Sequence, residues 1–355
     1  MSNFKLKNNW FRRTANFYVS VSNGVGVALE SSQDWSQKYE DNHRINIQKQ
    51  QRTYSTSKKV KINPSFVSGF TDAEGCFTIS IVRKNKLKVG RWVLPSFQIE
   101  LHQKDKALLE QMKSYFGVGS ISEYGSRQSN RFRVQSVKDL QVIIDHFENY
   151  PLITKKRADY ELWKQAFYLI QNKEHLTMEG LEKIVAIKAS MNKGLSPELK
   201  AAFPNITSMD RPLVKDSKIQ DPNWLAGFTS GEGCFFIETK KSSAYKTGFQ
   251  VSLIFQLTQH SRDITLMESL IKFWDCGKCE QPLNYNHVDF RIQKFSDITD
   301  KIIPFFNKYP IYGIKALDYA DFVKAVEIMK SKAHLTQNGL EEIRKIKAGM
   351  NKGRQ

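Results

Sequence analysis

The chain has 355 residues, and its 40% hydrophobic and 25% charged residues are typical of a globular protein. Its 54 Lys and Arg residues outnumber its 36 Asp and Glu residues, and the formal net charge of +18 favours a polyanionic partner. The sequence has no run of 18 apolar residues, which argues against a membrane span, so nucleic acid is the expected polyanionic partner. Four cysteines are too few for a disulfide framework in a chain of this length.

The first 60 residues have no counterpart elsewhere in the chain. They are polar, rich in Asn, Gln and Ser, and without sustained periodicity. We predict a basic, flexible extension over residues 1–60; a segment translated in frame from upstream coding sequence would have a similar composition. Within it, RTYSTS at 52–57 is similar to a mitochondrial processing junction.

An eleven-residue segment then occurs twice. Residues 67–77 read VSGFTDAEGCF and residues 225–235 read LAGFTSGEGCF. Further segments repeat at nearly the same offset, among them LHQKDKALLE (101–110) with LTQHSRDITLME (257–268), if two residues are inserted in the second copy. The sequence therefore predicts a duplicated domain, with repeats at 61–194 and 222–355 and a polar linker at 195–221.

The periodicity within each half predicts an αββαββα unit. Asn63-Pro64 and Asp221-Pro222 are helix-start signals, and Gly75 is placed to end the first helix as a C′ residue. The elements expected after that helix are a hairpin over 76–103, a helix over 104–116, a second hairpin over 119–137 and helical structure over 137–191. Each half is thus expected to be α+β with a four-stranded antiparallel sheet.

Small residues are spaced four apart in both repeated helices. Gly69 and Ala73 form such a pair in the first helix, and Gly227 and Gly231 form one in the second. A stripe of small residues lets two helix backbones approach closely. We therefore expect the two helices to pack on each other.

This packing would bring Glu74 and Glu232 together at the C-terminal ends of the helices. Carboxylates are unfavourable there, because the helix end already carries partial negative charge and like charges repel. Two carboxylates with the carbonyls of Ala73 and Gly231 would form an all-oxygen site that suits a hard divalent cation such as Mg²⁺.

GFTDAEG and GFTSGEG resemble the signature helices of the LAGLIDADG homing endonucleases, in the two-motif, single-chain branch. The segments FQIELHQKD, YPLITKK, KEHLT and MNKGLS are also similar to that branch, and most similar to its fungal mitochondrial, intron-encoded group. The resemblance covers about residues 62–353. It implies two pseudo-symmetric repeats whose sheets form a DNA-binding saddle over the major groove, with the signature helices at the interface.

The resemblance also implies roles for individual residues. Glu74 and Glu232 would bind catalytic metal at the scissile phosphates, where water attacks phosphorus and the 3′ oxygen leaves. The family has a water-organising polar residue after the second strand and a phosphate-stabilising lysine further on. The matching positions are Gln103, Gln259, Lys156 and Lys315, with Lys155 as a neighbour that a misregister would bring in. Mg²⁺ is the expected cofactor; Mn²⁺ is expected to substitute, and Ca²⁺ is expected to bind without supporting efficient cleavage.

Strand alternation predicts which side chains face DNA. In the first strand the odd positions from Phe77 onward are apolar, so the other parity is assigned to DNA. The predicted contacts in the first repeat are Cys76, Thr78, Ser80, Val82, Lys84, Lys86, Lys88, Arg91, Ser122, Tyr124, Arg127, Gln128, Asn130 and Arg133. Those in the second are Cys234, Phe236, Glu238, Lys240, Lys241, Lys246 and Gln250. Because the two sets differ, an asymmetric double-stranded target is expected.

These features predict a monomeric, site-specific homing endonuclease, mitochondrial and encoded within a mobile intron. An RNA-binding maturase that assists splicing of its own intron is the alternative, and a non-catalytic DNA-binding repressor is a third reading. A basic surface serves all three, and the first two functions can coexist. The presence of both glutamates favours cleavage, because binding alone does not require acids at the site.

Overall fold

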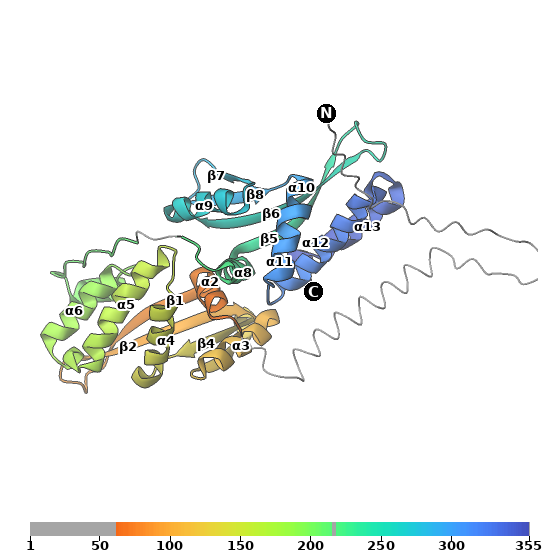
Figure 1. Cartoon of the computed structure of the whole chain (residues 1–355). Coiled ribbons are helices and arrows are strands. Elements are labelled where there is room, and N and C mark those ends of the chain that lie inside the picture. Colours follow the sequence, from red (N-terminus) through yellow and green to blue (C-terminus); the bar gives the residue numbers. More distant parts are fainter. Residues whose placement is uncertain (1–61, 215–217, 355) are drawn as a thin grey trace, which may run out of the picture. The chain divides into compact units, whose positions relative to one another are not determined.

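The computed structural model describes residues 62–214 and 218–354, which belong to one compact unit (Figure 1). The predicted extension at 1–60, with its processing segment, lies outside the described residues. In the part of the chain that is described, no helix is both long and apolar enough to cross a membrane.

Both halves have the same order of elements. The first contains α2 Pro64–Glu74, β1 Gly75–Arg83, β2 Arg91–His102, α3 Lys106–Phe116, β3 Ser120–Tyr124, β4 Ser129–Val134, α4 Val137–Asn149, α5 Lys156–Gln171 and α6 Met178–Ala189. The second contains α8 Pro222–Glu232, β5 Gly233–Lys241, β6 Phe249–His260, α9 Ile264–Trp274, β7 Lys278–Glu280, β8 His287–Ile292, α10 Phe295–Asp297, α11 Ile303–Lys308, α12 Lys315–Lys330 and α13 Gln337–Ala348. A π-helical turn, Ile298–Ile302, joins α10 to α11.

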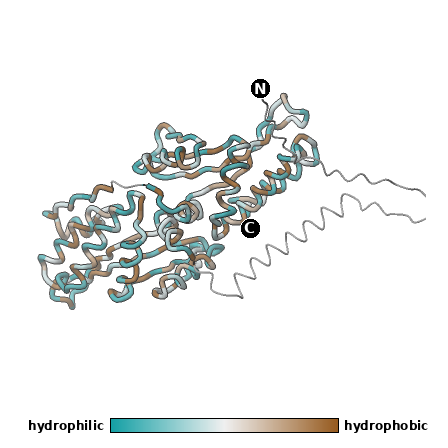
Figure 2. The backbone as a smooth tube through the Cα atoms, in the orientation of Figure 1, coloured by the Kyte–Doolittle hydropathy of each residue, from teal (hydrophilic) through white to brown (hydrophobic). Residues whose placement is uncertain are grey.

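Each half contains a four-stranded antiparallel sheet, in the orders β1-β2-β4-β3 and β5-β6-β8-β7. Helices cover one face of each sheet, and the side chains between them form one apolar core per repeat. Figure 2 shows the resulting alternation of apolar and polar stretches along the strands. The predicted α+β fold with two similar repeats is confirmed.

The two signature helices, α2 and α8, begin as predicted. The side chain of Asn63 accepts hydrogen bonds at the start of α2, Asp221 does so for α8, and a proline follows each cap. The predicted end of α2 is right, but Gly75 does not adopt the left-handed conformation of a C′ glycine. Its φ of −72° and ψ of 151° are extended. Glycine is needed there because a Cβ would lie 2.8 Å from the carbonyl oxygen of Thr71.

Helices α2 and α8 pack backbone to backbone at the centre of the compact unit (Figure 1). A Cβ added at Gly69 would lie 2.7 Å from the carbonyl carbon of Trp224, and one added at Gly227 would lie 2.8 Å from the nitrogen of Phe70. Real Cβ atoms do not approach that closely, so neither position tolerates a side chain. The predicted contact through small residues is confirmed.

The segment between the repeats contains an element that the sequence did not predict. Ser196 caps a short helix, α7 Pro197–Ala202, through a hydrogen bond to the nitrogen of Leu199. Further along, Arg211 forms an ion pair of 2.7 Å with Asp159 of α5. The described part of this segment is therefore fastened to the first repeat.

Candidate active site

Glu74 and Glu232 are the last residues of α2 and α8, so the contact between these helices brings the two carboxylates together. A Cβ added at Gly231 would lie 3.1 Å from Cγ of Glu74 and 3.4 Å from its Oε1. Within residues 62–214 and 218–354, no group donates a hydrogen bond to either carboxylate. The predicted pairing of the glutamates is present, and both carboxylates are available to a ligand.

A lysine from another helix reaches the end of each signature helix. Lys156, the first residue of α5, donates from Nζ to the carbonyl oxygens of Thr71 at 2.9 Å and Ala73 at 3.0 Å. Lys315, the first residue of α12, donates to the carbonyl oxygen of Gly231. The ammonium groups thus bind carbonyl oxygens at the C-terminal ends of both helices and offset the negative helix ends.

Lys155 does not share this position. Its Nζ donates to the carbonyl oxygen of Val214, at 3.0 Å. The lysine that the structure brings to the glutamates is therefore Lys156.

Burial shifts the pKa of each of the four charged groups. It raises the pKa of Glu74, and it raises the pKa of Glu232 to about 7, with a further contribution from the neighbouring Glu74. Burial lowers the pKa of Lys156 and Lys315, while the glutamates act in the opposite direction. Two partly desolvated carboxylates without hydrogen-bond donors favour the arrival of a cation.

The described residues include no cluster of three or more His, Cys, Asp or Glu side chains that could hold a metal ion. Two carboxylates nevertheless fit Mg²⁺, which is commonly bound through one or two carboxylates, with water and substrate phosphate as the other ligands. The carbonyls of Ala73 and Gly231, predicted as metal ligands, accept hydrogen bonds from lysines. The site thus fits a divalent cation that is held jointly by protein and phosphate oxygens.

The predicted pairing of Gln103 with Gln259 is wrong. Strands β2 and β6 have the same length and the same pairing register, so the second copy has no two-residue insertion. Gln259 therefore corresponds to Leu101, and Gln103 corresponds to Ser261. Gln103 lies in the turn after β2, whereas Gln259 lies within β6, where its Oε1 accepts a hydrogen bond from the nitrogen of His260.

The glutamines that do occupy equivalent positions in the two repeats are Gln98 and Gln256. They pair across the sheets with Cys76 and Cys234, two residues beyond the glutamates. Both lie in the motif FQ, at 97–98 and 255–256, which aligns without an insertion and could have identified them.

The predicted parity of β1 and β5 is confirmed by burial. Phe77, Ile79 and Ile81 lie in the core, while the alternate side chains lie on the face that no helix covers, here called the open face. The predicted residues on the open face or in its exposed turns are Cys76, Thr78, Ser80, Val82, Lys84, Lys86, Lys88, Ser122, Tyr124, Arg127, Gln128, Arg133, Cys234, Phe236, Glu238, Lys240, Lys246 and Gln250. Lys241 has the parity of the covered face but is exposed at the end of β5.

Besides Lys241, two predicted DNA contacts do not have the parity of the open face. Asn130 is 3% exposed and shares the covered face with Phe132, because both have even parity in β4. Arg91 also has the covered parity, and its guanidinium binds Glu198 of α7 at 2.9 Å. The alternation of β4 predicts Arg131 in place of Asn130.

Arg131 is indeed on the open face, and its equivalent in the second repeat is Asp289. Arg291 in β8, the equivalent of Arg133, also lies on the open face. Arg131 donates to Glu100 at 2.6 and 2.9 Å and lies 4.6 Å from the ring centroid of Tyr124. Arg291 is held more loosely, since its Nη1 is 3.7 Å from Glu280. Basic side chains therefore project from both open faces.

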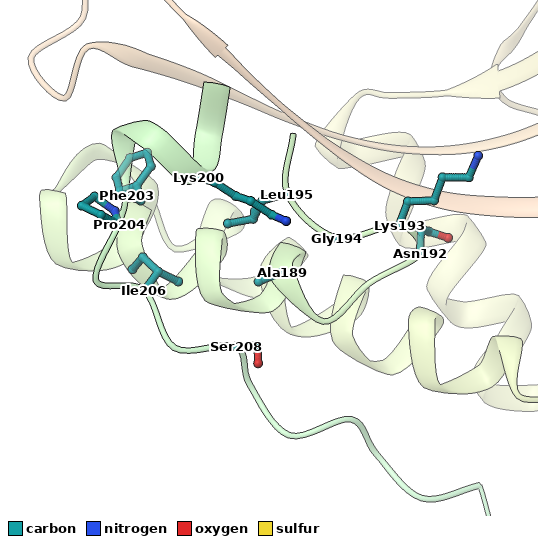
Figure 3. Close-up of a pocket in the computed structure, with 10 residues that line it drawn as sticks. All are labelled: Ala189, Asn192, Lys193, Gly194, Leu195, Lys200, Phe203, Pro204, Ile206 and Ser208. Atoms are coloured by element: carbon teal, nitrogen blue, oxygen red, sulfur yellow. The ribbon is translucent and has the colours of Figure 1, made fainter. Parts of the chain in front are cut away.

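A cavity of about 590 Å³ lies elsewhere, between the end of α6, α7 and the chain that follows (Figure 3). Its lining includes Lys193, Lys200 and Phe203 but none of the glutamates or lysines described above. It is therefore separate from the candidate active site.

Relatives of known sequence are intron-encoded proteins of fungi. "Probable intron-encoded endonuclease 3" of Neurospora crassa is 39% identical over 322 residues, which is 90% of this chain and 60% of that protein. "Probable intron-encoded endonuclease 2" of the same fungus is 40% identical over 307 residues, or 83% of this chain and 66% of that protein. The chain thus spans less than two thirds of these two relatives. A third, "Uncharacterized 50.9 kDa protein in ND4 intron 1" of Podospora anserina, is 46% identical over 134 residues.

Solved structures cover the fold more fully. I-SmaMI, a LAGLIDADG homing endonuclease bound to cleaved DNA, matches with a TM-score of 0.81 and 48% identity over 83% of this chain and 99% of that one. I-CpaMI bound to uncleaved DNA matches with a TM-score of 0.79 and 46% identity over 82% and 99%.

I-SmaMI has also been solved on uncleaved DNA with calcium ions, and as a variant in which two lysines, 159 residues apart, are replaced by alanine. The family described as LAGLIDADG endonuclease matches residues 67–167 and 225–326 of this chain, one region in each repeat. With paired glutamates at the junction of two similar repeats, the chain belongs to the LAGLIDADG endonuclease family.

Proposed function

We propose that the chain is a monomeric, site-specific homing endonuclease that makes a divalent-metal-dependent double-strand break in a long, asymmetric DNA target. The observation that carries this proposal is the pairing of Glu74 with Glu232 where the two repeats meet, with Lys156 and Lys315 beside them. Each repeat supplies one carboxylate and one ammonium group, as two coordinated cuts would require.

The reaction proposed is phosphodiester hydrolysis, in which water attacks phosphorus and the 3′ oxygen leaves. A divalent cation, when bound, supplies Lewis-acid stabilisation of the charge that develops on the phosphate oxygens. Glu74 and Glu232 would hold it, with the carbonyls of Ala73 and Gly231 as further oxygens. Mg²⁺ fits this oxygen set, Mn²⁺ would substitute, and Ca²⁺ would bind without efficient cleavage.

Lys156 and Lys315 would stabilise negative charge on the scissile phosphates. Their ammonium groups already lie at the ends of the signature helices, so they need little movement to reach a bound phosphate. Their separation of 159 residues equals that of the two lysines replaced in the I-SmaMI variant, which supports their assignment as the corresponding pair.

The open faces of the two sheets would lie in the major groove. They carry Arg131 in one repeat and Arg291 in the other, with different neighbours, which suits an asymmetric target. Arginine can pair with guanine at base edges, while most basic contacts go to phosphate.

The comparisons favour the endonuclease over the RNA-binding maturase, because the two Neurospora relatives are named endonucleases and I-SmaMI and I-CpaMI have been solved on DNA. The intron in the name of the Podospora relative supports an intron-encoded, mitochondrial origin and a role in intron mobility.

The test is cleavage of a randomised duplex library in Mg²⁺ by the parent and by Glu74→Gln, Glu232→Gln and Glu110→Gln. Glu110 is an exposed acid of α3 and serves as the charge-matched control. We expect the parent and the control to enrich one long asymmetric cut site, and both active-site variants to lose double-strand cleavage. Cleavage that persists in EDTA or in the active-site variants would exclude this mechanism, and binding of intron RNA without any DNA cleavage would favour the maturase.

A further inference from the structure

Asp105 and Asp263 are two buried acidic residues that have no role in the site described so far. They occupy equivalent positions at the ends of the 3-10 turns η1 Gln103–Asp105 and η4 Ser261–Asp263, just before α3 and α9. Neither side chain caps the helix that follows it. Both are substantially buried, and burial raises the pKa of both carboxyls.

Each carboxylate instead reaches into the other repeat. Oδ1 of Asp105 accepts a hydrogen bond from the backbone nitrogen of Ile314, at 2.6 Å. Oδ1 of Asp263 accepts one from the backbone nitrogen of Lys155, at 2.7 Å. The two bonds cross the interface in opposite directions and have equivalent partners.

These bonds fix the starts of the two helices that carry the active-site lysines. Lys155 and Ile314 are the N-cap residues of α5 and α12, and neither has a side chain that caps its own helix. A carboxylate at a helix N-terminus satisfies a free N–H group and interacts favourably with the helix dipole. The next residue in each helix is the lysine, Lys156 or Lys315.

The loop before each lysine is held a second time, from within its own repeat. Oδ2 of Asp72 accepts a hydrogen bond from the nitrogen of Ile153 at 3.0 Å, and Oγ of Ser230 accepts one from the nitrogen of Tyr312 at 3.1 Å. The internal anchor thus differs between the repeats, whereas the crossed anchor is an aspartate in both.

The crossed contact is tight in the second repeat. A Cβ added at Gly313 would lie 2.5 Å from Oδ1 of Asp105, so a side chain there would displace the Asp105 carboxylate. The loop that presents Lys315 is therefore shaped around a side chain of the first repeat.

We propose that Asp105 and Asp263 are reciprocal positioning residues, each of which sets the place of the active-site lysine in the opposite repeat. Asp105 positions Lys315, and Asp263 positions Lys156. Each repeat then completes its active site only with a residue of the other. This inference rests on the proposed roles of the two lysines in cleavage.

The test is single-turnover cleavage of a target duplex with the two strands labelled separately. Asp105→Ala should slow cleavage by roughly 10- to 100-fold, in the same strand pattern as Lys315→Ala, because a small misplacement of a catalytic group has effects of that size. Asp263→Ala should reproduce the pattern of Lys156→Ala. Asp105→Asn and Asp263→Asn keep an acceptor oxygen and should recover most of the rate.

Affinity and additivity separate positioning from general damage. Kd for the target should change less than about two-fold in each variant. The double variant Asp105→Ala/Lys315→Ala should be no slower than Lys315→Ala alone, since the two act on one group. Full additivity, or equal losses in rate and affinity, would overturn the proposal. Glu110→Ala and Glu268→Ala, exposed acids at equivalent positions of α3 and α9, are the controls.

Hydrogen exchange tests the placement without any cleavage. Asp263→Ala should lower protection in a peptide spanning 153–158, in the first repeat, and leave 312–317 unchanged; Asp105→Ala should do the reverse. Loss of protection only around the mutated residue would overturn the proposal even if the enzyme cleaves normally. If the parent cleaves no DNA, the proposed function is refuted. The hydrogen-exchange experiment would still test whether each aspartate orders the loop in the opposite repeat.

Discussion

The two repeats share one skeleton but hold their signature helices differently. In the first, Asp72 is a fully buried carboxylate that accepts hydrogen bonds from Ile153, from Thr154 and, across the interface, from Nε1 of Trp224 at 2.8 Å. At the equivalent position, Ser230 donates to the carbonyl of Ala226 and accepts from Tyr312.

A buried charge and a neutral hydroxyl thus perform the same local task. The charge is tolerated only because several donors surround it, so removing it exposes all of them to an apolar environment. Duplication preserved the geometry but not the chemistry by which it is held. In the first repeat the Asp72 side chain alone accepts hydrogen bonds from three residues, whereas Ser230 in the second accepts one, from Tyr312.

The largest expected difference between the repeats concerns this position. Asp72→Ala should lower the free energy of unfolding by roughly 3–5 kcal/mol, because it leaves buried donors without an acceptor. Ser230→Ala should lower it by about 1 kcal/mol. Urea denaturation followed by fluorescence measures both, and equal losses would contradict the inequality of the repeats.

The next difference concerns pH. The folded-state pKa of Glu232 is about 7, above the ordinary value of 4.5, so between these values the folded protein keeps a proton that the unfolded chain has released. Its contribution to stability is therefore complete below pH 4.5 and is lost as pH rises through 7, a loss of roughly 3 kcal/mol.

Glu232→Gln should consequently be more stable than the parent at pH 8 and equal to it near pH 4.5, in the absence of divalent cations. The pKa of Glu74 is raised as well, so Glu74→Gln should gain in the same direction, by less. Thermal unfolding across this pH range measures the gain. If the melting temperatures of the parent and the variants change in parallel with pH, the pKa values of the two carboxyls are not raised by folding.

The smallest expected difference lies on the open faces. Arg131, whose equivalent in the second repeat is Asp289, is bound closely by Glu100. Arg291, the equivalent of Arg133, is 3.7 Å from Glu280 and is more available to DNA. Arg291→Ala should weaken target binding by about 1 kcal/mol, roughly five-fold in Kd, and Arg131→Ala by less. Anisotropy titrations in Ca²⁺ at several salt concentrations measure this; the reverse order would show that Arg131 leaves Glu100 on binding.

Sequence patterns correctly predict the features of the fold that follow from local periodicity and from the repeat. The start of α2 follows from Asn63-Pro64, the sheets follow from strand alternation, and the pairing of Glu74 with Glu232 follows from the small-residue stripe. These inferences need only the repeat and neighbouring positions.

The predictions are wrong or missing where a residue's position depends on the alignment register or on a contact between distant parts of the chain. An assumed insertion paired Gln103 with Gln259, although the repeat aligns without a gap. Asn130 was assigned against the parity of its own strand. The bond from Asp263 to Lys155 could not be predicted, because it joins residues 108 positions apart whose proximity follows only from the packing of the two halves.

The close contact at Gly69 and Gly227 also bears on how such a protein can diversify. Since main chain contacts main chain there, the separation of Glu74 from Glu232 does not depend on side-chain size or shape at that point. In the proposed endonuclease, substitutions on the sheets would therefore change the preferred DNA sequence while the spacing between the two cuts stays constant. Under the proposed function, target specificity and the spacing of the two cuts can therefore evolve independently.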